Sequence, residues 1–310
     1  MKVDIVIPTY KPTEDFIYLI EKLKKQSVSV NKIIIMNTEE KYFEILICGT
    51  HFLTQNLDLE IHHLSRQEFD HGRTRNAGAA KSDADYVVFM TQDAMPVSED
   101  LLLHLVSPLE KDSSIAVSYA RQLPKDESSI VEKITREFNY PANSMVKSKE
   151  DRERLGIKTY FCSNVCAAYN MKIFKELKGF ISHTIFNEDM IYAAKAIEAG
   201  YKIAYVAEAG VIHSHDYSCL QQFHRNFDLG VSQADNSEIF AGISSQSEGK
   251  KLVKLTLGRL SQAKQKCKIF PFLIMCGYKY SGYLLGKHYK MLPRGIVLTC
   301  TMNQSYWKQI

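Results

Sequence analysis

Residues 69–94, FDHGRTRNAGAAKSDADYVVFMTQDA, indicate the fold more directly than any other part of the sequence. They predict a basic loop, a short helix, a buried strand and an acidic residue at the end of that strand. Arg73 and Arg75 can bind phosphate oxygens with their guanidinium forks, the start of the following helix attracts the same anion, and Gly72 permits close backbone approach to a ligand. Ligands of parallel sheets bind at the carboxyl ends of strands, where Asp93 lies. The stretch therefore predicts an α/β protein with a nucleotide and metal site.

The rest of the body alternates short apolar runs with amphipathic stretches, as βαβ units do. Strands are predicted at 3–8, 32–36, 57–64, 86–90, 115–120, 159–169 and 202–206. Helices are predicted at 14–26, 171–177 and 188–199, with one or two more in the polar segment 126–156. We expect a Rossmann-like, mostly parallel central sheet flanked by helices, with the site at one edge of the sheet.

Charge is distributed unevenly along the 310 residues. Residues 250–310 carry 12 Lys and Arg and no Asp or Glu, so all 35 acidic residues lie in the body before them. The tail interleaves leucines and tyrosines with its lysines, which suits an anionic membrane surface. Packing on the body and a homo-oligomer contact are the alternatives. Nucleic acid is disfavoured as a partner, because the body is acidic and no binding motif is present.

The cysteines and the apolar runs indicate the cellular compartment in which we expect the protein. The seven cysteines are scattered without a C-x-x-C pair, which predicts reduced thiols in a cytoplasmic protein rather than a disulfide framework or structural zinc. The N-terminus enters a strand almost at once, unlike a signal peptide. The longest apolar run of the tail, 269–278, is too short to span a bilayer.

Five short motifs occur in order along the chain: IVIPTY at 5–10, FDHGRTRN at 69–76, TQDA at 91–94, NED at 187–189 and HSH at 213–215. Together they resemble the inverting family-2 glycosyltransferases with the GT-A fold, over roughly residues 1–230. TQDA after DHGRTRN is similar to bacterial rhamnosyltransferases that use dTDP-L-rhamnose. The resemblance implies a GT-A domain at 1–240, with a nucleotide-sugar half at about 1–125 and an acceptor half at about 126–240. The Ser/Gly/Gln-rich stretch 242–249 is the candidate junction, and the residue pattern predicts a basic amphipathic helical tail at 250–310.

The resemblance also implies which residues hold the nucleotide-sugar donor. The end of the first strand is where the family contacts the nucleotide base, and Asn37 stands where the family often has an Asp. An amide can still bond a pyrimidine edge. Thr91 replaces the first Asp of the family's D-x-D motif, and Asn164 lies where related enzymes hold donor sugar or acceptor. The expected donor-binding residues are Pro8, Thr9, Tyr10, Asn37, Asp70, His71, Arg73, Arg75, Thr91, Gln92 and Asn164.

Asp93 remains from that motif, and the resemblance implies that it binds a divalent cation bridging the two donor phosphates. Hard oxygen ligands favour Mn²⁺ or Mg²⁺. His213 and His215 alternate on an extended segment, so their side chains point the same way. The resemblance implies that one of them completes the metal shell or contacts the diphosphate. Without the other motifs, Asp93 would be read as a helix cap and the histidines as structural.

Glu188 and Asp189 open a predicted helix and match the family's E-D pair, whose Asp is the catalytic base. Inverting transfer needs a carboxylate to take the proton of the acceptor hydroxyl as it attacks the anomeric carbon. The resemblance therefore implies Asp189 as the base, with Glu188 shaping the acceptor site. The alternative is structural, because acidic residues favour the first turn of any helix.

The resemblance thus implies transfer of L-rhamnose from dTDP-β-L-rhamnose to a hydroxyl of a lipid-linked oligosaccharide. The reaction would take place at the inner face of a bacterial cell membrane, during surface polysaccharide synthesis, with acceptor choice in the loops at 126–160. Two alternatives stay open: the same fold with a UDP-sugar donor (galactose or N-acetylglucosamine), and a non-catalytic membrane-docked scaffold. A nicotinamide dehydrogenase is disfavoured, because no G-x-G-x-x-G follows the first strand.

Overall fold

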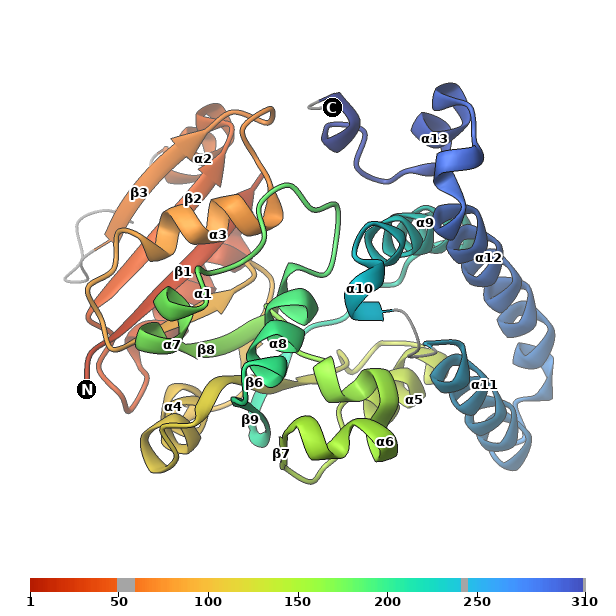
Figure 1. Cartoon of the computed structure of the whole chain (residues 1–310), viewed down its shortest axis with the longest axis horizontal. Helices are drawn as coiled ribbons and strands as arrows, with labels where there is room; N and C mark the ends of the chain where they lie inside the picture. Colours follow the sequence, from red (N-terminus) through yellow and green to blue (C-terminus); the bar gives the residue numbers. More distant parts are fainter. Residues whose placement is uncertain (49–58, 241–244, 309–310) are drawn as a thin grey trace.

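One nine-stranded mixed sheet organises the chain (Figure 1), in a computed structural model that describes residues 1–48, 59–240 and 245–308. The strands are β1 (Val3–Tyr10), β2 (Lys32–Thr38), β3 (Leu59–Leu64), β4 (Tyr86–Met90), β5 (Met95–Pro96), β6 (Ile115–Leu123), β7 (Met145–Lys147), β8 (Cys166–Asn170) and β9 (Lys202–Ile212). The α-helices are α1 (Glu14–Lys24), α2 (Glu40–Ile47), α3 (His71–Ala79), α4 (Leu101–Lys111), α5 (Ile130–Asn139), α6 (Arg152–Leu155), α7 (Met171–Glu176), α8 (Glu188–Glu198), α9 (Cys219–Asp235), α10 (Ser237–Phe240), α11 (Ser245–Gln262), α12 (Ile269–Lys287) and α13 (Arg294–Cys300).

Strand direction brings most strand ends to one edge of this sheet. The strand order is β3-β2-β1-β4-β8-β6-β9-β5, with β7 paired to β9. The strands β1, β2, β3 and β4 run parallel, and so do β6 and β9. Because β8 is antiparallel to both β4 and β6, those two strands point the same way. The carboxyl ends of β1, β2, β4, β6 and β9 and the amino end of β8 therefore share one edge, which is where such sheets bind ligands.

Helices cover both faces of the sheet and bury its apolar side chains. Ile5 and Val6 of β1 point to opposite faces, as successive strand residues do, and belong to two separate core clusters. Phe16 and Leu19 of α1 pack in the cluster of Ile5. On the other face α3 crosses the strands (Figure 1), and its Gly78 allows close approach, since a Cβ there would lie 2.5 Å from Cγ1 of Val6.

An aromatic cluster fixes the position of α8 against the sheet. Phe89, Tyr169, Phe174, Phe180 and Tyr192 lie with ring centroids 5.0 to 5.8 Å apart, mostly edge to face. These rings come from β4, β8, α7, the loop before α8, and α8 itself. The two acidic residues that begin α8 are therefore held near the edge where the strand ends meet.

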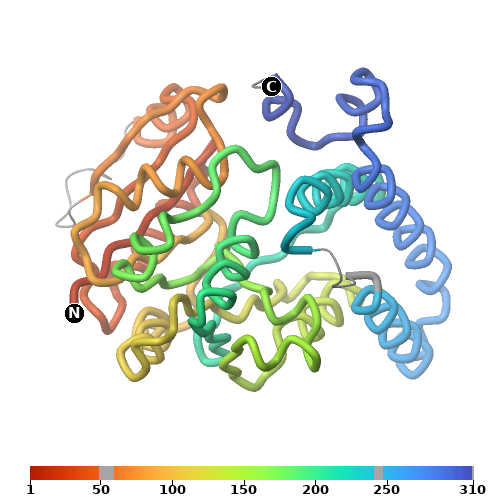
Figure 2. Tube along the Cα trace, in the orientation of Figure 1, coloured from red at the N-terminus to blue at the C-terminus, as the bar shows by residue number. Residues whose placement is uncertain are grey.

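The two long helices α9 and α12 lie side by side in the C-terminal part (Figures 1 and 2). Their approach requires glycine on α12. A Cβ at Gly282 would lie 2.3 Å from the carbonyl oxygen of Phe223, and one at Gly286 would lie 2.0 Å from that of Phe227. One face of α12 thus packs tightly on α9. None of the helices in the described residues is long and apolar enough to cross a membrane.

The chain folds back on itself after α13. Tyr306 and Trp307 are buried in a cluster with Phe227 and Val231 of α9. His183, in the loop before α8, stacks on Tyr306 with ring centroids 4.7 Å apart. Residues 301–308 are therefore part of the packed C-terminal half.

The structure departs from the sequence-based prediction at several places. The antiparallel β8 makes the sheet mixed, because apolar periodicity shows where a strand lies and not which way it runs. The predicted strand 159–169 is a 3₁₀ helix at Gly156–Tyr160, a loop, and then β8. Strand β9 continues to Ile212, and the short strands β5 and β7 are not predicted. Residues 57–58 of a predicted strand and 242–244 of the predicted junction lie outside the described residues.

Candidate active site

A cavity of about 500 Å³ opens at the edge where the strand ends meet. It draws residues from the ends of β4, β6 and β9 and from the helices α3, α5, α8, α9 and α12. The sequence-predicted residues that line it are His71, Arg75, Thr91, Asp93, Asn164, Glu188, Asp189, His213 and His215. Those that lie outside its walls are Pro8, Thr9, Tyr10, Asn37, Asp70, Arg73 and Gln92.

Asp93, His213 and His215 form a cluster with the spacing of a metal site. Their ligand atoms all lie within 4.8 Å of one another. Nε2 of His213 is 3.6 Å and Nε2 of His215 is 3.2 Å from carboxylate oxygens of Asp93, and the two Nε2 atoms are 3.1 Å apart. The cluster exists because β4 and β9 end at the same edge, so that residues following each strand converge.

The protonation of this cluster favours a cation between its members. Burial lowers the pKa of His213 to about 3, so the ring is neutral at neutral pH. Oε1 of Gln122, which also accepts a hydrogen bond from Arg136, lies 3.1 Å from Nδ1 of His213. Nδ1 therefore carries the proton, and Nε2 turns its lone pair toward Asp93. Burial alone would raise the pKa of Asp93, but the hydrogen bond from His215 holds it below its ordinary value, and the carboxylate is ionised.

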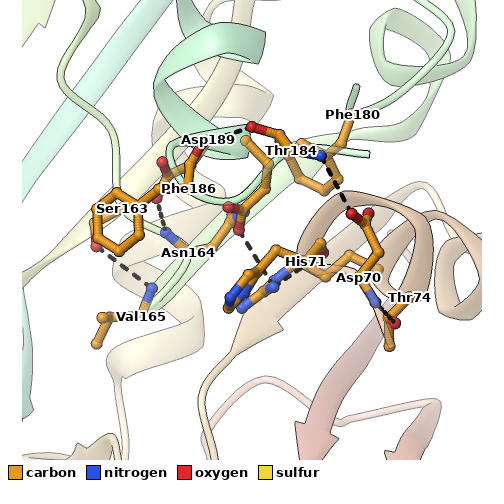
Figure 3. Close-up of polar contacts among 12 residues, drawn as sticks. Asp70, His71, Thr74, Ser163, Asn164, Val165, Phe180, Thr184, Phe186 and Asp189 are labelled. Carbon is orange, nitrogen blue, oxygen red and sulfur yellow. Dashed lines mark hydrogen bonds and ion pairs between the residues drawn. The ribbon is translucent and has the colours of Figure 1, made fainter. Parts of the chain in front are cut away.

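Asp189 lies in the first turn of α8 and is held by backbone donors. Its Oδ2 accepts a hydrogen bond from the N–H of Asn164 at 3.0 Å, a contact seen in Figure 3, and its Oδ1 accepts one from the N–H of Met190 at 2.8 Å. Burial, together with the charge of the adjacent Glu188, raises the pKa of Asp189 to about 7. A carboxyl group with a pKa near neutrality is suited to act as a general base.

Glu188 is a buried carboxylate whose charge is compensated inside the protein. Its Oε1 lies 3.2 Å from Nη1 of Arg75 and accepts a hydrogen bond from Nδ2 of Asn164 at 3.1 Å. Burial alone would raise the pKa of Glu188, but Arg75 and His71 hold it below its ordinary value. Arg75 lines the cavity as the sequence predicts, yet its charge is paired with Glu188.

The segment at the start of α3 serves mainly to fix the backbone. Asp70 is the N-cap: its Oδ1 accepts from the N–H of Arg73 at 2.7 Å, and its Oδ2 from the N–H of Thr184 at 3.2 Å (Figure 3). Gly72 is required by the protein itself, because a Cβ there would lie 1.9 Å from the carbonyl oxygen of Ile181. Arg73 donates to the carbonyl of residue 68 and lines a different surface depression. Asp70 and Arg73 are thus not brought together with the cavity residues.

Residues at the ends of β1, β2 and β4 are linked to one another by hydrogen bonds. Gln92 accepts from the N–H of Tyr10 at 2.9 Å and donates to its carbonyl at 3.0 Å. Thr9 donates to Oδ1 of Asn37 at 3.0 Å, and the amide of Asn37 lies 2.9 Å from a ring nitrogen of a histidine on β3. Pro8 sits within β1, paired in register with β2. Asn37 is fully buried, so its hydrogen-bonding groups are used within the protein.

A second cavity, of about 330 Å³, adjoins the first. The two cavities share His71, Phe186 and Arg225 as wall residues. Tyr10 and Thr38, the last residues of β1 and β2, also line the second cavity. It therefore occupies the strand ends at which the sequence predicts contacts with the nucleotide base.

Three basic residues that belong to none of the five motifs also line the first cavity. Arg136 of α5 pairs with a glutamate one helical turn away. The guanidinium of Arg225 on α9 lies 4.6 Å from the ring centroid of Phe186. Burial lowers the pKa of Lys279, which belongs to α12 of the basic tail. One local signal was available, since Gln222 and Arg225 lie one helical turn apart soon after the HSH motif and both line the cavity.

Comparison with known proteins identifies relatives of the whole chain. The family described as Glycosyl transferase family 2 matches residues 4–178. The chain is 38% identical to the O-antigen chain rhamnosyltransferase RfbN of Salmonella typhimurium (strain LT2), over 100% of this chain and 97% of that protein. It is also 38% identical to the O-antigen chain rhamnosyltransferase WbaN of Salmonella anatum, over 99% of this chain and 96% of that protein.

Solved structures share the fold at low sequence identity. The mannosyltransferase PcManGT from Pyrobaculum calidifontis, in complex with GDP-Man and Mn²⁺, aligns with a TM-score of 0.56 at 13% identity, over 99% of this chain and 85% of that one. S. aureus TarS, residues 1–349, also aligns with a TM-score of 0.56 at 13% identity, over 100% of this chain and 88% of that one. The expected GT-A architecture, a sheet flanked by helices with a helical C-terminal part, is confirmed.

Proposed function

Because this chain belongs to glycosyl transferase family 2, we propose that it transfers L-rhamnose from dTDP-β-L-rhamnose to a hydroxyl of a lipid-linked oligosaccharide. The enzyme class follows from the family, and the two rhamnosyltransferases that are 38% identical over nearly the whole chain support the sugar and the role in surface polysaccharide synthesis. The observation that carries the chemistry is one cavity that holds Asp189 together with the cluster of Asp93, His213 and His215.

We assign Asp189 as the general base of an inverting displacement. Its carboxylate accepts the proton of the acceptor hydroxyl while the hydroxyl oxygen bonds to the anomeric carbon and the bond from that carbon to the diphosphate oxygen breaks. No covalent sugar–enzyme intermediate forms. The backbone N–H groups of Asn164 and Met190 orient the carboxylate. Glu188 and Arg75 sit beside it as an ion pair and shape the floor of the site. Burial and the charge of Glu188 raise the pKa of Asp189, and the charge of Arg75 opposes that rise.

The residues Asp93, His213 and His215 fit a divalent cation. The ionised carboxylate of Asp93 and the neutral Nε2 of His213 face each other at 3.6 Å, an arrangement that a cation between them would stabilise. Two imidazole nitrogens favour Mn²⁺ over Mg²⁺, because Mg²⁺ takes oxygen ligands almost exclusively. When bound, the ion would supply positive charge to the diphosphate as it leaves.

We assign the donor nucleoside to the second cavity and its diphosphate to the boundary between the two cavities. His71 and Arg225 line both cavities, so they can contact a group that bridges them. The hydroxyl of Thr38 is buried and has no hydrogen-bond partner among the described residues, and Thr38 lines the second cavity. Buried polar atoms are nearly always paired, so this hydroxyl is a natural contact for the base. Base recognition is thereby proposed for Tyr10 and Thr38 rather than for Asn37.

We propose that α12 lies on the cytoplasmic face of the membrane that carries the acceptor. Phe270, Leu273, Ile274 and Tyr278 form an exposed apolar stripe at helical spacing, and Phe270 is 71% exposed. Lysines at both ends of the helix suit anionic headgroups. Sedimentation with vesicles containing phosphatidylglycerol tests this: exchange of Phe270 and Ile274 for serine should abolish it. Retained vesicle binding would contradict this placement of the stripe, and dimers that dissociate in the double variant would point to an oligomer contact instead.

Donor identity is tested by nucleotide binding followed by turnover. We expect dTDP with Mn²⁺ to raise the melting temperature of the purified protein more than UDP or GDP does, and EDTA to remove the effect. Release of dTDP from dTDP-rhamnose should then require a lipid-linked acceptor. Preference for UDP would replace the donor within the same family, and no response to any nucleotide would favour a scaffold.

A further inference from the structure

The second cavity has a wall that comes from residues 301–308, after α13. Met302, Asn303 and Ser305 line it together with Tyr10 and Thr38 from the other end of the sequence. The composition of the basic tail predicts contact with a membrane surface, with packing on the body and an oligomer contact as alternatives. In the structure its last described segment packs on the body and reaches the ends of β1 and β2.

Asp228 of α9 anchors this segment with three hydrogen bonds. Its Oδ1 accepts from the hydroxyl of Thr301 at 2.6 Å, and its Oδ2 accepts from the N–H groups of Met302 at 3.0 Å and Asn303 at 3.3 Å. Asp228 is only 3% exposed, so these bonds are shielded from water. Burial raises the pKa of Asp228 to about 6, and the three bonds oppose that rise, so the carboxylate is ionised at neutral pH. Bonds to a buried carboxylate are stronger than neutral ones, which holds the backbone at 301–303 in one position.

Aromatic packing fixes the segment on its other side. Tyr306 and Trp307 are buried, and the carbonyl of Trp307 accepts a hydrogen bond from Arg294 at 3.0 Å. His183 stacks on Tyr306. The segment is therefore held by contacts both before and after the residues that line the cavity, and it forms a fixed wall of that cavity.

The chemistry of this wall suits a flat heterocycle with carbonyl groups. Oδ1 of Asn303 accepts from the N–H of Tyr306, while its Nδ2 has no hydrogen-bond partner among the described residues. An amide N–H₂ group is a donor that matches a base carbonyl. The rings of Tyr10 and Phe69, and the apolar side chain of Met302, offer contact area to the face of a base.

We propose that Met302, Asn303 and Ser305 form one wall of the nucleoside pocket, with the Asn303 amide donating to a carbonyl of the pyrimidine base and Asp228 positioning the wall. The inference rests on the proposed function, which supplies a pyrimidine nucleoside diphosphate as ligand. It makes the C-terminal segment part of donor recognition, in addition to any contact of the tail with a membrane. Asn303 is a contact residue, whereas Asp228 acts through the backbone that it holds.

The test compares two ligands that share a diphosphate and differ in the nucleoside. Calorimetric titration of the full chain with Mn²⁺ measures Kd for dTDP and for inorganic diphosphate. Asn303→Ala should weaken dTDP binding about tenfold, the value of one hydrogen bond in a buried site, and leave the Kd for inorganic diphosphate unchanged. Asp228→Asn should also weaken dTDP selectively, because it disturbs the wall and not the metal cluster. Gln304→Ala is the matched control, since Gln304 is exposed, bonds to the carbonyl of Leu298, and does not line the cavity.

The outcomes separate this inference from the donor assignment. If wild type prefers UDP, the donor assignment fails, and the same three variants test the wall with UDP. If Asn303→Ala binds the preferred nucleotide within twofold of wild type, the wall proposal is overturned while the donor assignment stands. Equal losses for the nucleotide and for inorganic diphosphate would also overturn it, because they would indicate a general loss of structure. Binding of no nucleotide by wild type would overturn both.

Discussion

Exchange of Asp189 for asparagine tests the assignment of the general base more sharply than any other change. Asparagine has the shape of aspartate, and its Oδ1 can still accept the hydrogen bond from the N–H of Asn164. Its Nδ2 cannot accept from the N–H of Met190, so one backbone donor loses its partner. The amide can take no proton from an acceptor hydroxyl. Geometry is therefore largely kept while the chemistry is removed.

The expected loss of rate follows from what a general base contributes. Positioned proton transfer is worth about 10²–10⁴-fold, or about 3 to 5 kcal/mol of activation free energy. We expect Asp189→Asn to lose about that much kcat, with Kd for dTDP changed less than threefold because the donor groups lie elsewhere in the cavity. In wild type, turnover should rise with pH and level off above about 7, because only ionised Asp189 accepts the proton. The variant should lack this rise.

The stability of the fold supplies a second test, because the contribution of Asp189 to stability falls with rising pH whereas its contribution to turnover rises. The folded-state pKa of Asp189 lies above its ordinary value of 3.8, so the protonated form is favoured in the folded protein. Its contribution to stability is full below the unfolded pKa and is lost as pH rises through about 7. Asparagine has no such loss. The melting temperature of Asp189→Asn minus that of wild type should therefore increase as the pH is raised from 5.5 to 8.5.

The assays are single-turnover release of dTDP from dTDP-rhamnose with acceptor present, and thermal melting at both pH values. Wild-type turnover by Asp189→Asn would refute the base assignment. A relative melting temperature that falls as pH rises would refute the view that burial and Glu188 raise the pKa of Asp189.

Four further outcomes are expected. His213→Ala should remove the Mn²⁺-dependent part of dTDP stabilisation in a melting assay, and an equal Mn²⁺ response in wild type and variant would contradict the metal cluster. Gly286→Ala should lower stability by about 1–3 kcal/mol in denaturant unfolding, because a Cβ there would lie 2.0 Å from a carbonyl oxygen of α9. A Cβ added at Gly277, on the same helix, would meet no atom within 4 Å. Gly277→Ala should therefore raise the free energy of unfolding by about 0.5–1 kcal/mol. Arg75→Met should cost about 3–5 kcal/mol at pH 8, because it leaves Glu188 as an unpaired buried charge, and stability equal to wild type would argue against the ion pair.

The sequence predicts those elements whose signal lies within a few neighbouring residues. Apolar runs mark β1, β2 and β4, and helical spacing of apolar residues marks α1 and α8. A strand buried inside a sheet or a helix that packs one face on a sheet needs such a pattern, whatever the rest of the fold is. The rule that ligands bind at strand ends, combined with motif order, also predicts that Asp93, Asp189 and His213 share a site. They do line one cavity. Local pattern gives no strand direction, so the antiparallel β8 is not predicted.

The roles of individual polar residues depend on partners that are distant in the chain. Asp70 and Gln92 match family positions, yet in the fold they cap a helix and join two strand ends. Arg75 is neutralised by Glu188, more than a hundred residues later, a pairing that spacing cannot reveal. The sequence shows which side chains can bind an anion, and only the tertiary contacts show which of them are already engaged.

By itself, the sequence determined the α/β class and the family and predicted candidates for the base and the metal ligands, because periodicity and short motifs are properties of adjacent positions. The tertiary structure alone decided where the basic tail goes. Its amphipathic helices satisfy the same local pattern on a membrane, on another subunit or on the body. Glycines at 282 and 286 let α12 pack on α9, and this packing places Lys279 of α12 at the first cavity. Asp228 holds residues 301–303, so that this segment reaches the second cavity. Such contacts depend on the packing of the whole chain, and no local stretch encodes them.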